Sequence, residues 1–311
     1  MKILHLYSDW RWTGPAEPVS NLSKSLEDIG ISSIVAIRKP IRFDSNDIEQ
    51  KLKARNISYT TDLKLNRYFN LTGIKDNIID FFKIPAFVKE NKFDIVHMHL
   101  SHDFSLGMAL LPFFTNVKII RTNHSGVALP NNIFNKTLIK NKLDILIDIS
   151  NIAKKNNMEQ FKLNDDRSVL VKGSVDHERF SPRPKSKEFS LALGIKDNDF
   201  VFGIVARLQR RRNFFMLLDA LNILRKNIKN FKFIFIGRGG KHFEELKQRV
   251  TELNLWDHII FPGYHNERYV DLLNLLDVKI FLVPGYDGSC RAVMEAMSMA
   301  KPVISSKRGI L

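Results

Sequence analysis

The sequence predicts an α/β protein built from two doubly wound domains, each with a parallel sheet that helices cover on both faces. Three observations support this fold class. Short apolar runs alternate with amphipathic segments of helix length, several of these runs are apolar at every position, and a polar segment divides the alternation into two series. The length of 311 residues agrees with two domains.

The first series starts at the N-terminus. Residues 2–7 (KILHLY) are expected to form a strand, and residues 19–29 have apolar side chains at helical spacing. The remaining expected elements are strands at 33–37, 95–97, 118–121 and 145–149 and a helix at 77–91. Strands that alternate with helices in this way form a parallel sheet.

A second series repeats the alternation after residue 200. Strands are expected at 200–205, 232–236, 259–261, 278–282 and 303–304. Helices are expected between them at 214–226, 241–253, 267–276 and 292–299.

The polar segment 173–190 contains two prolines and separates the two series. We therefore expect an N-terminal Rossmann-like domain at 1–174, a linker at 175–190 and a C-terminal Rossmann-like domain at 191–311. Parallel sheets of this type bind ligands beyond the carboxyl ends of their strands. A cleft between the two domains is the expected ligand site.

The composition excludes several classes of protein. With 44% hydrophobic residues the chain has enough apolar material for a packed core, and the single Cys290 rules out an internal disulfide. No apolar run reaches the roughly 20 residues of a membrane span, and the N-terminus lacks a signal-peptide core. These features predict a cytoplasmic protein.

The charge balance predicts anionic partners. Lys and Arg number 48 against 33 Asp and Glu, which gives a formal net charge of +15. Such a surplus suits nucleic acid, anionic lipid headgroups or phosphorylated substrates. The basic residues are scattered and are not interleaved with aromatic residues, so we do not expect nucleic-acid binding.

Two loops of the second series have the composition of phosphate-binding loops. Arg207 and Arg212 belong to a group of four arginines that follows a strand and precedes a helix, and guanidinium groups suit phosphate oxygens. Gly237 and Gly239 follow the next strand and would let a ligand approach the backbone. Taken alone, the arginine loop is explained equally well as a solvated basic turn. The glycine loop is explained equally well as an ordinary strand-to-helix turn.

A third loop adds carboxylates to this pattern. Asp287 follows a strand, and Glu295 lies eight residues later, inside the expected helix. The backbone N–H groups of Arg291 and Ala292 at the helix start would point at an anion between the two carboxylates. This combination suits a sugar nucleotide, which has hydroxyls at both ends and a diphosphate in the middle.

Several short motifs in the same order resemble those of glycosyltransferase family 4, whose members are retaining enzymes with the GT-B fold. The motifs are Asp94-Ile-Val-His97-Met-His99, Val175-Asp176 followed by Phe180-Ser-Pro182, Phe261-Pro-Gly263, the Asp287-to-Glu295 spacing with EAM, and KPV at 301–303. The resemblance covers nearly the whole chain.

The resemblance implies roles for the donor-side residues. Arg207 and Arg212 would hold the donor diphosphate, Glu295 would accept from the nucleotide ribose, and Asp287 would contact hydroxyls of the transferred sugar. Asp287 stands where the family has a longer glutamate, and Arg212 stands where lysine is commoner. The identity of the donor sugar is therefore left open.

The resemblance also implies two positions in the first domain. His124 corresponds to a histidine at the end of a strand near the donor sugar, and we take His124 and Asp287 as the candidate catalytic residues. Gly14 lies in the counterpart of an N-terminal glycine loop, in which Pro15 replaces a second glycine. His97 and His99 are expected to be ordinary strand residues on one face, because a metal site needs further ligands.

The function implied is metal-independent transfer of a sugar, with retention, from a nucleotide-diphosphate donor to a hydroxyl acceptor. The basic charge favours a glycolipid or glycan acceptor of the cell envelope, such as lipopolysaccharide, and peripheral contact with an anionic membrane at its inner face. Family members normally continue beyond residue 311, so the C-terminal domain is expected to be truncated. One alternative is a remnant that binds nucleotide sugars without turnover, and another is GT-B phosphorylase or epimerase chemistry.

Overall fold

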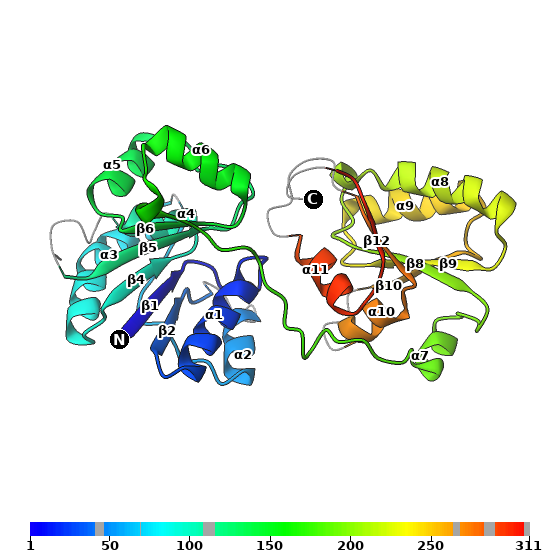
Figure 1. The fold of residues 1–311 in the computed structure, drawn as a ribbon, viewed down its shortest axis with the longest axis horizontal. Coiled ribbons are helices and arrows are strands. Elements are labelled where there is room, and N and C mark those ends of the chain that lie inside the picture. Colours follow the sequence, from blue (N-terminus) through cyan, green and yellow to red (C-terminus); the bar gives the residue numbers. More distant parts are fainter. Residues whose placement is uncertain (41–46, 69, 108–115, 264–267, 283–289, 308–311) are drawn as a thin grey trace. The chain divides into compact units, whose positions relative to one another are not determined.

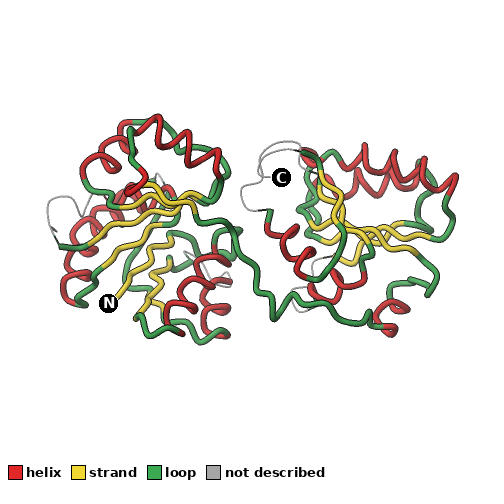
Figure 2. The backbone as a smooth tube through the Cα atoms, viewed as in Figure 1, coloured by secondary structure: helices red, strands yellow, loops and turns green. Residues whose placement is uncertain are grey.

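The computed structural model describes the chain except residues 41–46, 69, 108–115, 264–267, 283–289 and 308–311. The chain folds into two compact units, Met1–Gly173 and Ser174–Leu311, which we call the N-terminal unit and the C-terminal unit. Each is an α/β unit with one parallel sheet (Figures 1 and 2), so the predicted fold class is confirmed.

The N-terminal unit contains a seven-stranded sheet with the order β3-β2-β1-β4-β5-β6-β7. Its strands are β1 (Lys2–Tyr7), β2 (Ser32–Ile37), β3 (Tyr59–Thr60), β4 (Ile95–Met98), β5 (Lys118–Asn123), β6 (Ile145–Asp148) and β7 (Ser168–Leu170). The helices are α1 (Ala16–Asp28), α2 (Asp47–Ala54), α3 (Leu71–Glu90), α4 (Ser101–Leu106), α5 (Ile133–Asn141) and α6 (Asn151–Phe161), with a 3-10 turn at Asp165–Arg167.

Strand β1 shows why its sequence is apolar at almost every position. Leu4 and Leu6 point into one core cluster, whereas Tyr7 packs with Ala16 and Val19 of α1 on the other face. Both faces of the strand are therefore buried, as a central parallel strand requires. His5 shares the face of Tyr7, because side chains two residues apart on a strand point the same way.

The C-terminal unit contains a five-stranded sheet with the order β10-β9-β8-β11-β12. Its strands are β8 (Phe200–Val205), β9 (Phe231–Ile236), β10 (Ile259–Gly263), β11 (Val278–Phe281) and β12 (Val303–Ser305). Its helices are α7 (Lys187–Ala192), α8 (Phe214–Asn227), α9 (Lys241–Glu252), α10 (Tyr269–Leu275) and α11 (Arg291–Ser298), with a 3-10 turn η3 at Arg210–Arg212.

Strand order reverses once in each sheet, and the reversal positions the candidate sites. From β1 the chain continues outward through β2 and β3 and then returns to β4 on the other side of β1. In the same way β8, β9 and β10 run one way and β11 lies on the other side of β8. Connections diverge beyond the carboxyl ends of β1 and β4 and of β8 and β11, which is where such sheets bind ligands.

Most expected elements are present within one to three residues of their predicted ends. The helix predicted at 77–91 begins earlier, at Leu71, and the helix predicted at 267–276 is α10, which begins at Tyr269. Helices α2, α4, α5, α6 and α7 and the short strands β3 and β7 were not predicted. Among the described residues, no helix is both long and apolar enough to cross a membrane.

Candidate functional site

The loop after β8 carries Arg207 and Arg212 at the carboxyl edge of the C-terminal sheet. Arg207 is exposed, whereas Arg212 is partly buried at the end of η3. Their neighbour Arg210 has a different role, because its guanidinium makes contacts of 2.7 and 3.0 Å to the two carboxylate oxygens of Glu245. His242 also contacts Glu245, at 2.6 Å, so Arg210 ties the loop to α9.

The glycines of the loop after β9 differ in what surrounds them. A Cβ at Gly237 would lie 1.9 Å from the carbonyl oxygen of Ala206, so this glycine lets two strand-end loops approach each other. The backbone N–H of Leu208 donates to the Arg238 carbonyl at 3.1 Å and joins the same two loops. Backbone packing therefore requires a glycine at position 237, and its place beside a bound ligand stays a prediction. Gly239 is exposed and lies against the ring of Phe243.

Helix α11 begins at Arg291 and carries Ala292 in its first turn and Glu295 in its second. The Glu295 carboxylate is buried, at 4% exposure, and accepts a hydrogen bond of 2.5 Å from the Tyr269 hydroxyl through Oε2. Its Oε1 lies 3.0 Å from Nε of Arg291. Burial, followed by the adjacent carboxylate, raises the pKa of Tyr269, so the phenol stays protonated as the donor. Asp287 lies outside the described residues.

A second buried charge stands close to Glu295. Lys279 on β11 has no exposed surface, and its Nζ has no hydrogen-bond partner in the described part of the chain. Burial lowers its pKa to about 7, and the carboxylate of Glu295 opposes that shift. A lysine inside an otherwise apolar strand is costly unless it is neutral or paired.

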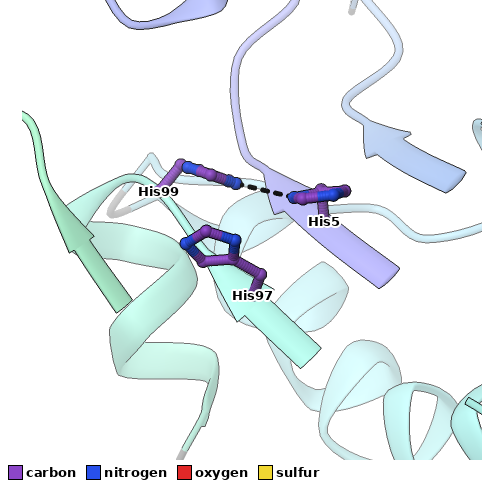
Figure 3. A group of neighbouring side chains, drawn as sticks. All are labelled: His5, His97 and His99. Atoms are coloured by element: carbon purple, nitrogen blue, oxygen red, sulfur yellow. Dashed lines mark hydrogen bonds between the residues drawn. The ribbon is translucent and has the colours of Figure 1, made fainter. Parts of the chain in front are cut away.

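In the N-terminal unit, four histidines form a row at the carboxyl ends of β1, β4 and β5. Nδ1 of His5 lies 2.9 Å from Nε2 of His99, and Nδ1 of His99 lies 3.1 Å from Nε2 of His124. The first contact is drawn in Figure 3. The ring of His97 lies tilted against that of His99, with ring centroids 4.1 Å apart, and its Nε2 lies 2.8 Å from the Thr122 hydroxyl.

All four rings are held neutral at physiological pH. Burial lowers the pKa of His5 to about 4, and burial followed by the nearby Arg121 guanidinium lowers that of His124 to about 4. Burial first and the neighbouring rings second lower the pKa values of His97 and His99 well below their usual range. A neutral imidazole has one N–H donor and one acceptor nitrogen, so hydrogen bonds along the row are directional.

Two side chains fix the loops that carry these histidines. The buried Asp103 carboxylate accepts from the backbone N–H groups of Ser8, His99 and Leu100 at 2.7–3.2 Å, which joins the loops after β1 and β4. Burial raises the pKa of Asp103 to about 6. Asn123 bonds Asp148, the Val127 carbonyl and Ser125 and so shapes the turn that holds His124. Gly14 is exposed, two residues before α1.

The row also contains a group with metal-ligand character. One ring nitrogen from each of His5, His97 and His99 lies within 4.8 Å of the others, and three imidazoles can ligate a transition metal. Two facing nitrogens in the row, those of His5 and His99, share a proton at 2.9 Å. A metal ion bound by these two nitrogens would need the lone pair of each. The proton between them would have to leave, so metal binding would break this hydrogen bond.

The predicted residues His124, Arg207, Arg212, Arg291, Ala292 and Glu295 follow strands of the two sheets, in the loops or the helix after each strand, and their roles in ligand binding stay predictions. Sequence reasoning missed Tyr269, Lys279, His5 and Asp103, and it took His97 and His99 as ordinary strand residues. The available signal was a charged or imidazole side chain inside an apolar strand, as at Lys279 and His5. Only the pairing of β1 with β4 shows that His5 lies beside His97.

Family models cover almost the whole chain. The model described as Glycosyltransferase Family 4 matches residues 16–179, and that described as Glycosyl transferases group 1 matches residues 185–311. The chain is 26% identical over 253 residues to the UDP-Gal:α-D-GlcNAc-diphosphoundecaprenol α-1,3-galactosyltransferase of Escherichia coli. That alignment covers 76% of this chain and 63% of the relative. Over 147 residues, 46% of this chain and 41% of the relative, it is 30% identical to the lipopolysaccharide core mannosyltransferase LpsB of Rhizobium meliloti.

Solved structures agree with the fold. A glycosyltransferase from Rickettsia africae superposes with a TM-score of 0.79 at 20% identity, over 100% of this chain and 80% of that one. HepE of Anabaena, solved with UDP and glucose, superposes with a TM-score of 0.78 at 18% identity, over 99% of this chain and 81% of that one. Together with the match of its family model to residues 16–179, more than half of the sequence, these findings show that the chain belongs to glycosyltransferase family 4 and has the GT-B fold class.

Proposed function

We propose that the protein transfers a sugar, with retention of anomeric configuration, from a nucleotide-diphosphate donor to a hydroxyl acceptor in the synthesis of lipopolysaccharide or another envelope polysaccharide. The Escherichia coli relative, by its name, uses UDP-Gal and a diphosphoundecaprenol-linked acceptor, and LpsB acts in lipopolysaccharide core synthesis. Family membership and these relatives support the proposal.

One observation carries the donor assignment. The basic loop after β8 and the helix α11 after β11 leave neighbouring strands at the point where the order of the C-terminal sheet reverses. Arg207 and Arg212 come from the first connection, and Arg291, Ala292 and Glu295 come from the second. Guanidinium groups and a helix N-terminus at one switch point suit a diphosphate.

Each residue has a proposed role in this site. Arg207 and Arg212 stabilise the negative charge that develops on the leaving diphosphate, and the first N–H groups of α11, at Arg291 and Ala292, add backbone donors. The exposed Gly239 leaves the neighbouring backbone open to the donor. Glu295 accepts from the ribose hydroxyls through lone pairs that Tyr269 and Arg291 do not use, since a carboxylate has about four acceptor positions.

Asp287 and His124 complete the proposal on the sugar side. Asp287 contacts hydroxyls of the transferred sugar, and His124 lies near that sugar as a neutral hydrogen-bonding group. Transfer is proposed to proceed without a metal and without a covalent nucleophile, with the leaving phosphate assisting the acceptor hydroxyl. The acceptor is a glycolipid or glycan at the cytoplasmic face of the membrane, and no nucleic acid takes part.

Donor binding tests this proposal directly. A thermal-shift panel of UDP-, GDP-, ADP- and CMP-sugars should show one base that raises the melting temperature, because a ligand that binds the native state stabilises it. Arg207→Ala and Glu295→Gln should each weaken the binding of that nucleotide by at least about tenfold, equivalent to roughly 1.4 kcal/mol. Lys226→Ala, which removes one exposed charge at the far end of α8, is the matched control.

If both site variants bind the nucleotide as tightly as the wild type, the roles assigned to Arg207 and Glu295 are contradicted. If none of the nucleotide sugars raises the melting temperature, the proposal that the donor is a nucleotide sugar is contradicted. Retention is tested separately, by the anomeric coupling constant of the product in proton NMR. A product of inverted configuration would overturn that part of the proposal alone.

A further inference from the structure

The outward surface of α3 is apolar along about half of the helix. Leu71, Ile78 and Phe82 are 88%, 57% and 64% exposed, and Ile74 and Phe81 are also exposed. We call these five residues, with Lys75, Lys83 and Lys89, the outward face of α3. In a helix that covers a sheet, this side normally carries polar residues.

The apolar residues of this face are contiguous rather than scattered. Positions 71, 74, 78 and 82 are spaced by three and four residues, so their side chains are neighbours on one face of the helix. Single exposed apolar side chains are ordinary on protein surfaces, but a continuous stripe marks an interaction surface. Over twelve residues, from Leu71 to Phe82, it is roughly 16 Å long at 1.5 Å per residue.

The charged residues of α3 are sorted by sign. Asp80 is buried and accepts from the backbone N–H groups of Lys64 and Leu65 at 2.9 and 2.6 Å, and Asp76 accepts from Asn66 at 2.8 Å. Lys75, Lys83 and Lys89 are exposed, and Glu90 at the last position is the only exposed acid of the helix. Asp76 and Asp80 thus accept hydrogen bonds from the preceding segment of the N-terminal unit. Apart from Glu90, the exposed apolar and charged side chains of α3 are apolar or basic.

The face is preformed. Asn70 caps the helix by accepting from the Gly73 N–H at 2.7 Å, and Ile84 and Val88 anchor the inner side in the main core of the N-terminal unit. A Cβ at Gly73 would lie 1.8 Å from the Tyr68 carbonyl, which fixes the start of the helix against the preceding chain. Binding through this face requires no rearrangement of α3.

We propose that the outward face of α3 docks on an anionic lipid bilayer, with its apolar side chains in the headgroup region and its lysines on the lipid phosphates. A helix with one apolar face flanked by lysines is the form in which proteins lie in a membrane interface. The formal net charge of +15 acts in the same direction. The purpose of this contact, access to a lipid-linked acceptor, rests on the proposed function, whereas the surface itself does not.

Charge favours lipid over a second copy of this chain as the occupant. A twofold dimer through α3 would place the same face on both sides of the interface and bring the lysines of the two copies together. Like charges held close at an interface oppose association. An anionic bilayer instead neutralises every lysine of the face.

Vesicle co-sedimentation of the full chain tests the proposal. The wild type should bind phosphatidylcholine vesicles that contain phosphatidylglycerol, should bind pure phosphatidylcholine poorly, and should lose binding as salt is raised. The double variant Ile78→Glu, Phe82→Glu should lower the partition coefficient at least about tenfold, equivalent to roughly 1.4 kcal/mol. The control Met216→Glu, Ile223→Glu on α8 changes side chains of matched exposure, 57% and 63%, and should bind like the wild type.

Three results would overturn the proposal: equal vesicle binding by the α3 variant and the wild type, equal wild-type binding to both kinds of vesicle, or a wild-type dimer in sedimentation equilibrium that the α3 variant dissociates. Phe82→Trp adds a direct readout, because brominated lipid should quench its fluorescence more strongly than that of the wild type, whose three tryptophans lie outside α3. The nucleotide thermal shift should be unchanged in both double variants. A failed nucleotide panel with intact vesicle binding would therefore reject the proposed function and leave the docking surface standing.

Discussion

Nδ1 of His99 lies 3.1 Å from Nε2 of His124, and the opposite nitrogen of His99 lies 2.9 Å from Nδ1 of His5. His99 therefore uses both ring nitrogens to join a fully buried histidine to the candidate catalytic one. Because each neutral ring has a single proton, the two hydrogen bonds must point in the same direction along the row. The proton positions of all three rings are coupled.

The surroundings of His5, at one end of the row, determine the direction in which these hydrogen bonds point. Nε2 of His5 is buried and has no partner among the residues described. Orphaned buried N–H groups are rarer than underused acceptors, so we assign the proton of His5 to Nδ1. His5 then donates to His99, His99 donates to His124, and His124 keeps its own N–H at Nδ1. In this state His124 offers a donor and not a base at its outer nitrogen.

Nitrogen-15 NMR of histidine-labelled protein should therefore show His124 as the Nδ1–H tautomer at neutral pH. His99→Phe removes the donor and should allow the Nε2–H tautomer to appear. A His99→Gln variant, which can still donate, should preserve the wild-type chemical shifts of His124 better than His99→Phe. An Nε2–H tautomer in the wild type would show that the row runs the other way, and zinc-dependent shifts of His5 and His99 would show a metal site instead.

Stability should fall as the pH falls below 6.5. His5, His102 and His124 have pKa values of about 4 in the folded chain, lowered chiefly by burial from about 6.5 in the unfolded chain. Between these values the unfolded chain binds more protons, which favours unfolding. Asp103, whose pKa is raised to about 6, has the opposite effect, as do Asp80 and Asp148, whose pKa values burial also raises. The histidines outweigh these three carboxyls, because His97 and His99, whose pKa values burial lowers well below their usual range, bring the histidine side to five groups.

Urea unfolding at pH 7 and pH 5 should therefore differ by at least ~2 kcal/mol, since one pKa unit corresponds to about 1.4 kcal/mol. His5→Gln should reduce the dependence of the free energy of unfolding on pH, whereas the same change at the exposed His177 should leave this dependence unchanged. Constant stability across this range would show that the histidines are not held neutral by burial.

An element of this fold could be predicted from the sequence where it is long enough to show a clear periodic pattern of apolar residues. The long central strands and the helices α8 and α9 have clear periodicity and were predicted almost to the residue. Strand β3 has two residues and α4 has six, too few for a period to be read. Helix α3 was predicted too short because its first turns carry apolar residues on the solvent side, which blurs the amphipathic pattern.

The candidate sites divide in the same way. Arg207 and Arg212 follow a strand in an obvious cluster, and their position at a sheet edge could be predicted from the sequence alone. The histidine row could not, because it depends on the register that sets His5 beside His97 and on loops that Asp103 joins. Tyr269 and Glu295 lie on different helices, 26 positions apart, and only the packed unit brings them together.

Lys279→Met should stabilise the protein. The lysine is fully buried, its pKa is lowered to about 7, and its Nζ has no hydrogen-bond partner within the part of the chain that the structure describes. Methionine has a similar shape and no charge to desolvate, and replacing buried charge by apolar groups has stabilised other proteins by about 1–4 kcal/mol.

The pH dependence distinguishes this cause from simple repacking. A folded-state pKa below the unfolded value weakens stability fully up to about pH 7, and the effect disappears as the pH rises to the unfolded pKa near 10.5. The gain from Lys279→Met should therefore shrink between pH 7 and pH 10, while the exposed Lys229→Met should change little at either pH. A destabilised Lys279→Met would mean that the ammonium supports the Glu295 carboxylate more than its burial costs.

Gly237→Ala should destabilise the C-terminal unit, whereas Gly240→Ala should not. The added methyl at Gly237 would lie 1.9 Å from the Ala206 carbonyl oxygen, a backbone atom that cannot rotate away, while Gly240 has open space around it. Separating the two strand-end loops should cost at least ~2 kcal/mol, in the range of an overpacked core. Arg207 follows Ala206 directly, so nucleotide affinity should fall together with stability in Gly237→Ala and remain in Gly240→Ala. Equal unfolding midpoints for the two variants would show that the loops after β8 and β9 can separate freely.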